Sequence, residues 1–202
     1  MLRNKNTSVK LFCFSPPVMV ATFVIEVALL VYVLVRYHMN SAIRLIVAAL
    51  GSLGLFQLSE YYVCGGMGAD AATWSRVGFV AITALPPIGL HLLHVLAGKP
   101  VGKLVAGAYV SMLAFMTYFA LSPTAFVGNE CTGNYVIFQI GVDAARVYGL
   151  YYYGWLLAAL LIGWRWITAT KTTKKIKPQI GALMIGYLVF LVPTGIANTV
   201  KP

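Results

Sequence analysis

The chain has 202 residues, of which 60% are hydrophobic and only 10% are charged. A soluble domain is about 45–50% apolar and about 25% charged, and a disordered chain is more polar still. The composition therefore excludes both classes and indicates a membrane protein. The formal net charge of +10 does not indicate a nucleic-acid partner, because the basic residues are spread between apolar segments and match no recognised nucleic-acid-binding fold.

Six apolar segments have roughly the length, about 20 residues, that a helix needs to cross a bilayer. They are 18–35, 45–63, 77–97, 104–121, 147–164 and 180–196. Continuous apolar runs favour helices, since the strands of a barrel alternate polar and apolar residues. We therefore expect an all-α, polytopic bundle that forms a single transmembrane domain over 1–202. The last segment stops close to Pro202, as in a seven-helix bundle that lacks its last helix.

The basic residues predict an orientation, because cytoplasmic loops carry the excess of Lys and Arg. Nine of the 15 lie in the first, third and fifth connections: Arg36, Arg44, Lys99, Lys103, Arg165, Lys171, Lys174, Lys175 and Lys177. We expect these loops in the cytoplasm, the N-terminus outside and the chain in the plasma membrane. The segment from Arg165 to Lys177 should attract anionic lipid headgroups.

All three cysteines fall on the predicted outer side. Cys64 and Cys131 lie in the second and fourth connections, which leave the same face of the membrane, and Cys13 precedes the first segment. An oxidising exterior permits a disulfide, so Cys64–Cys131 is our predicted bridge, with Cys13 left over. The alternative is three unpaired thiols.

Acidic and aromatic residues gather near the same outer interface. The candidates for ligand binding there are Glu60, Trp74, Tyr148, Tyr151 and Tyr152. One interpretation is an aromatic belt with solvated acids, which membrane proteins of any function display. The other is an outward-facing vestibule for a small polar or cationic ligand, which aromatic walls and a few acids would suit. Asp143 and Arg146 are three residues apart on one helix face and should pair with each other.

Glu26 lies near the middle of the first apolar segment. A charged carboxylate at that depth costs about 3 kcal/mol, so it either faces a partner inside the bundle or is protonated. Glu26 is therefore a further candidate for ligand binding, and the residue that a small proton-coupled transporter would use. The alternative is a neutral carboxyl group hydrogen-bonded to a neighbouring helix.

Three histidines lie towards the opposite, cytoplasmic side. His91 and His94 share a helix face at a spacing of three, and His38 follows the first segment. They are weak candidates for an intramembrane metal-dependent enzyme, since no carboxylate is expected on that side to complete the site. No lysine lies within a segment to hold retinal. We therefore predict no metal, no cofactor and a protein that is not an enzyme.

Pro86 and Pro87 fall inside the third segment. Proline lacks the N–H that a helix needs, so it kinks the helix and frees carbonyls one turn earlier. In a membrane these carbonyls must find partners on other helices or in a water-filled cavity. The sequence thus predicts a helix break with compensating contacts.

The same region carries a family resemblance. In and beside the third segment stand Trp74-Ser75-Arg76-Val77-Gly78-Phe79, then Leu85-Pro86-Pro87 and Gly98. A later run, Tyr148 to Trp155, is followed by a basic loop and another helix. These motifs resemble the N-terminal seven-helix membrane sensor region of bacterial histidine kinases. The resemblance implies a sensor with an outside N-terminus. Since the chain has six clear segments and no kinase domain, its signalling output would need a partner protein. A sensor or receptor-like bundle is our leading expectation.

Overall fold

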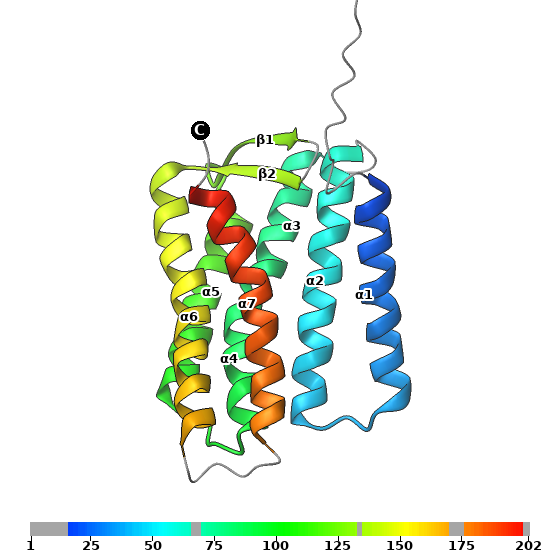
Figure 1. The fold of residues 1–202 in the computed structure, drawn as a ribbon. Helices are drawn as coiled ribbons and strands as arrows, with labels where there is room; N and C mark the ends of the chain where they lie inside the picture. The colour runs from blue at the N-terminus through cyan, green and yellow to red at the C-terminus, as the bar shows by residue number, and fades with distance from the viewer. Residues whose placement is uncertain (1–15, 66–69, 133–134, 170–175, 200–202) are drawn as a thin grey trace, which may run out of the picture.

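The computed structural model describes residues 16–65, 70–132, 135–169 and 176–199. Its helices are α1 (Pro16–Arg36), α2 (Ser41–Gly65), α3 (Ala71–Thr83), α4 (Leu85–Leu96), α5 (Lys103–Leu121), α6 (Val142–Thr168) and α7 (Lys177–Thr199). Figure 1 shows them as an upright bundle in which α3 stands above α4 and α1 lies at one edge. The fold is mostly helical, as predicted.

Four helical stretches in the described part of the chain are long and apolar enough to cross a membrane. They are Ser41–Val63, Ala71–Leu96, Lys103–Leu121 and Val142–Thr168. Large apolar side chains point outward from the bundle, with Val35 83% exposed and Leu121 75% exposed. A water-soluble protein rarely exposes so much apolar surface, so these helices indicate a membrane protein. The segments 18–35 and 180–196 coincide with α1 and α7, which are not among the four, so six crossings and a seven-helix bundle stay predictions.

The structure adds a β-hairpin to the predicted all-α fold. Strands β1 (Phe126–Thr132) and β2 (Tyr135–Ile140) pair antiparallel, with an irregularity between Phe126 and Gly128. The hairpin lies across one end of the bundle (Figure 1), which we call the hairpin end. Strand β2 has the sequence YVIFQI, whose aromatic and β-branched residues favour a strand. The hairpin end is the predicted outer side, and that orientation stays a prediction.

Two buried clusters hold α4 to α7 together. The first lies towards the end opposite the hairpin and consists of Leu90, Leu93, Val105, Ala108, Ala159 and Ile180. The second is centred on Tyr151, Tyr152 and Leu156 of α6, with Ile82 and Phe115 packed against it. Helix α1 packs mainly against α2. The best-packed part of the bundle therefore surrounds α4, directly below the predicted helix break.

Candidate functional site

The helix break lies at Ala84, between the end of α3 and the start of α4, and consists of an interruption of the helical hydrogen bonds while Ala84 keeps helical dihedral angles. Pro86 and Pro87 donate no backbone hydrogen bond, so the carbonyls of Ile82 and Thr83, four residues earlier, lose their usual donors. The Tyr151 hydroxyl of α6 donates to the Thr83 carbonyl at 2.6 Å. The predicted break is confirmed, and for Thr83 the compensating partner is a side chain from another helix.

A second hydroxyl of α6 reaches the same residue. The buried Thr83 hydroxyl donates to the Phe79 carbonyl at 2.6 Å and lies 3.1 Å from the Tyr148 hydroxyl. Tyr148 and Tyr151 are three residues apart, so both rings lie on one face of α6. We call Thr83, Tyr148 and Tyr151 the tyrosine latch, because they tie α6 to the point where α3 ends.

Aromatic rings surround the latch on the hairpin side. The Tyr148 ring lies 5.0 Å from Phe119 and 5.5 Å from Phe115 of α5, measured between centroids. Phe79 of α3 lies 4.8 Å from Phe119 and 5.2 Å from Phe126 of β1. Such tilted and edge-on pairs are favourable beyond the burial of their area. The latch therefore sits in a closely packed setting that fixes its tyrosine rings.

Arg76 of α3 secures the hairpin end of α5. Its Nη1 donates to the carbonyls of Phe119 at 3.2 Å, Ala120 at 3.1 Å and Ser122 at 2.8 Å. The last carbonyls of a helix have no partner within the helix, and a cation there is also favoured by the helix dipole. In the sequence Arg76 stood out only through the family resemblance, because carbonyl partners leave no residue signature.

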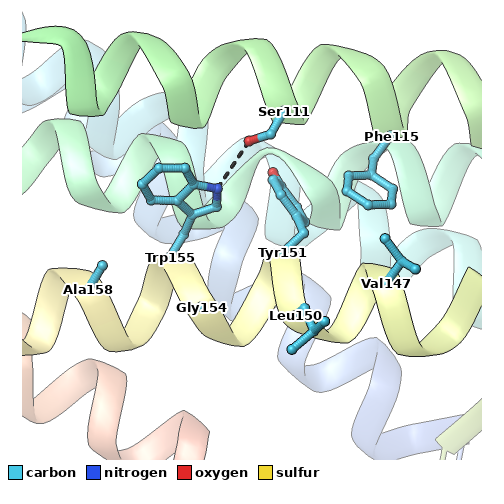
Figure 2. Close-up of a pocket in the computed structure, with 8 residues that line it drawn as sticks. All are labelled: Ser111, Phe115, Val147, Leu150, Tyr151, Gly154, Trp155 and Ala158. Atoms are coloured by element: carbon cyan, nitrogen blue, oxygen red, sulfur yellow. Dashed lines mark hydrogen bonds between the residues drawn. The ribbon is translucent and has the colours of Figure 1, made fainter.

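A groove of about 500 Å³ lies between α5 and α6. Figure 2 shows its lining: Ser111, Phe115, Val147, Leu150, Tyr151, Gly154, Trp155 and Ala158. The Trp155 indole donates to the Ser111 hydroxyl at 3.0 Å, and that hydroxyl donates to the Ala108 carbonyl at 2.9 Å. Tyr151 is both a wall of this groove and the donor of the latch, so the groove and the helix break share one side chain.

The other outer candidates lie elsewhere. Trp74 stacks on Tyr62 of α2 at 4.3 Å, and its buried indole nitrogen has no hydrogen-bond partner among the described residues. Glu60 of α2 is buried. The Tyr152 ring packs beside the Tyr148 ring, with 5.8 Å between their centroids. Of the six residues predicted to bind ligand, the structure brings together the three tyrosines of α6, and only Tyr151 lines the groove between α5 and α6.

Glu26 faces α2 at the edge of the bundle. Its Oε2 lies 3.9 Å from the position that a Cβ on Gly54 would take. This oxygen is buried and has no hydrogen-bond partner in the described part of the chain, and the same holds for Oε1 of Gln57, one turn further along α2. The alternative interpretation, a carboxyl group hydrogen-bonded to a neighbouring helix, is therefore not seen at Oε2.

The three histidines do not converge. His91 Nδ1 lies 3.1 Å from the Tyr109 hydroxyl of α5, and His94 Nδ1 lies 2.9 Å from the Leu90 carbonyl. His38 is exposed in the connection between α1 and α2. The described residues contain no group of three or more His, Cys, Asp or Glu side chains that could hold a metal ion.

Several predictions concern residues or side chains outside the part of the chain that the structure describes. Cys13 and the side chains of Cys64 and Cys131 lie outside the described residues, so the disulfide stays a prediction. The same is true of Lys171, Lys174 and Lys175 in the basic segment. The predicted pair of Asp143 and Arg146 is confirmed, with 3.7 Å between the carboxylate and the guanidinium.

Comparison of the chain with models of protein families, with curated proteins and with solved structures returns no match. The fold alone therefore gives the class, a membrane protein with apolar helices suited to a bilayer. Its distinguishing feature is a helix break, held by the tyrosine latch, beside a groove.

Proposed function

We propose that the protein is a membrane-embedded sensor or receptor-like bundle that binds a small ligand beside the tyrosine latch. One observation carries the proposal: Tyr151 lines the groove and also donates to the carbonyl that the helix break leaves free. A ligand that displaces the Tyr151 ring breaks this hydrogen bond. Occupancy of the groove is thereby coupled to the geometry of the break.

Helix α4 would carry the signal from the break to the opposite end of the bundle. It contacts α5 through His91 and Tyr109, and α6 through the edge-on rings of His94 and Trp166, 5.1 Å apart. Movement of α4 about Ala84 would change both contacts at the predicted cytoplasmic side. The resemblance to histidine kinase sensor regions supports this direction of signalling, with a partner protein as the receiver.

The alternative functions have less support from the geometry. A proton-coupled carrier would use Glu26, but α1 packs mainly on α2, at the edge of the bundle. A metal-dependent enzyme would use His38, His91 and His94, but their neighbours in the described chain are a tyrosine, a backbone carbonyl and an indole ring. Both alternatives stay predictions.

Releasing the latch should move α4, and spin-label distances can measure this. Labels are introduced as unnatural amino acids at Ser41 and Lys99, two exposed positions at the end opposite the hairpin, so that the native cysteines stay in place. In nanodiscs, Tyr151→Phe should shift or broaden the distance distribution relative to the unmutated chain. Tyr32→Phe, which removes a hydroxyl from an exposed ring on α1, should leave it unchanged. A distribution that Tyr151→Phe does not alter would contradict the proposed function.

A further inference from the structure

The groove between α5 and α6 continues towards the hairpin end. A second hollow of about 400 Å³ is lined by Ala114, Phe115, Tyr118, Asp143, Ala144 and Val147. It shares Phe115 and Val147 with the first. The two hollows adjoin at these residues and together follow α6 from Asp143 to Ala158. We call the two adjoining hollows the α5–α6 groove.

The length of the apolar part matches one leaflet of a bilayer. Helices rise about 1.5 Å per residue, so Val147 to Ala158 spans about 16 Å. Half of a hydrocarbon core about 30 Å thick is about 15 Å. The rim is open to the surroundings of the bundle, since Leu150 is 77% exposed. In a membrane the groove is thus a slot for a chain that enters from the leaflet on the hairpin side.

The chemistry of the wall selects an apolar occupant. The three polar groups of the lining, on Ser111, Tyr151 and Trp155, already take part in hydrogen bonds within the protein. The rest of the wall is hydrocarbon, aromatic ring and the Cα of Gly154. A polar ligand would leave its own groups unpaired there at substantial cost, whereas a hydrocarbon chain loses nothing.

Charges stand at one end of the groove only. Asp143 lines the hairpin end and is 99% exposed, and its partner Arg146 is 76% exposed. A guanidinium binds phosphate through its planar fork of donors, and a carboxylate attracts an ammonium group. Opposite charges beside each other therefore complement a zwitterionic headgroup at the membrane surface.

We infer that the α5–α6 groove binds one acyl chain of a zwitterionic phospholipid, with Arg146 at the phosphate and Asp143 at the ammonium group. The acyl chain passes Val147 and Leu150 and ends near Ala158, beside Tyr151 and Trp155. Because Tyr151 also forms the latch, the consequence of binding rests on the sensing function proposed above. The binding itself is measured independently of the latch.

Trp155 provides the readout, since bromine atoms on an acyl chain quench a nearby indole. The 202-residue protein in detergent micelles is titrated with phosphatidylcholine that carries one dibrominated acyl chain. The part of the quenching that disappears in Trp155→Phe is assigned to Trp155. For the unmutated groove we expect this part to saturate at a low mole fraction of lipid.

Gly154→Leu fills the groove, and Gly149→Leu is its matched control. A Cβ at Gly149 or at Gly154 meets nothing within 4 Å, so both positions have open space for a first side-chain atom, but only Gly154 lines the groove. Gly154→Leu should raise the lipid fraction for half-maximal quenching at least about tenfold, because the new side chain displaces several buried methylenes of the lipid. Gly149→Leu should leave that fraction unchanged. Equal titration curves for the two variants would overturn the site.

A second titration tests whether the groove recognises the phospholipid headgroup as well as the acyl chain. Asp143→Asn with Arg146→Gln should weaken quenching by brominated phosphatidylcholine and leave quenching by brominated diacylglycerol unchanged. If both lipids titrate as before, the headgroup assignment is wrong. If Gly154→Leu blocks the lipid while Tyr151→Phe leaves the spin-label distances unchanged, the lipid site stands and the sensing function is wrong.

Discussion

Replacing Arg76 with glutamine should lower the free energy of unfolding by about 2–3 kcal/mol, because hydrogen bonds to charged groups contribute about 1.5–3 kcal/mol. The guanidinium serves three carbonyls at the end of α5, and Phe119, which provides one of them, is completely buried. The shorter, neutral glutamine side chain cannot reach all three carbonyls. It also removes the cation that the C-terminal end of the helix dipole favours.

Unfolding of the purified chain by sodium dodecyl sulfate in mixed micelles measures this loss. Arg146→Gln is the matched control, since its ion pair with Asp143 is solvent-exposed and exposed pairs are worth about 0–1 kcal/mol. Arg76→Lys should lie between the unmutated chain and Arg76→Gln, because lysine keeps the cation but its ammonium group is more strongly hydrated than a guanidinium and is costlier to desolvate at the helix end. Equal stabilities for Arg76→Gln and Arg146→Gln would mean that the capping bonds contribute nothing.

Gly89→Leu should destabilise the chain by about 3 kcal/mol, the upper end of the usual cost of overpacking. Tyr187 of α7 lies directly against Gly89 of α4, and a Cβ at position 89 would collide with the tyrosine hydroxyl. This hydroxyl is buried and has no hydrogen-bond partner among the described residues. The absence of a side chain at Gly89 is therefore what lets α7 pack against α4.

The same denaturation assay tests this contact, with a second substitution that makes room. In a Tyr187→Ala background, Gly89→Leu should cost about 1 kcal/mol or less of stability, because the ring that it would collide with is gone. The stability effects of two substitutions at contacting residues depart from additivity by about 0.5–3 kcal/mol. Gly107→Leu on α5, where a Cβ meets nothing within 4 Å, should not destabilise the chain. A loss at Gly89 that persists in the Tyr187→Ala background would show that the helices meet elsewhere.

The apolar runs located the helices because lipid-facing and buried surfaces are both hydrophobic, which leaves long uninterrupted segments. The segment 104–121 became Lys103–Leu121, and 18–35 became Pro16–Arg36. The hairpin was missed because the residues of β2 look like an apolar lead into the next segment, and strand pairing with β1 has no local signal. Helix α6 begins at Val142 instead of 147, because Asp143 and Arg146 interrupt the apolar run without interrupting the helix.

The sequence was enough to predict individual residues of the site, but not the contacts between them. Pro86 and Pro87 fixed the position of the break, and Tyr148 and Tyr151 were candidates as part of an aromatic run. Their meeting at Thr83 could not be foreseen, since 68 residues separate Tyr151 from Thr83 and the rotation of α6 decides which ring faces the break. The role of Arg76 at the end of α5 was not predicted for a similar reason: its partners are backbone carbonyls, which any sequence provides.

The most direct measurement of the latch is a double-mutant cycle of Tyr151→Phe with Pro87→Ala. Tyr151→Phe alone should cost about 1–3 kcal/mol, because it leaves a buried carbonyl unsatisfied. Pro87→Ala restores the backbone N–H that can reach the Thr83 carbonyl, so in that background the cost should fall to about 0.5 kcal/mol. Pro86→Ala is the matched control, since it restores a donor for Ile82 and should leave the cost of Tyr151→Phe unchanged. If Tyr151→Phe costs the same in all three backgrounds, the tyrosine does not hold the break at Thr83, and the coupling between groove and helix break is contradicted.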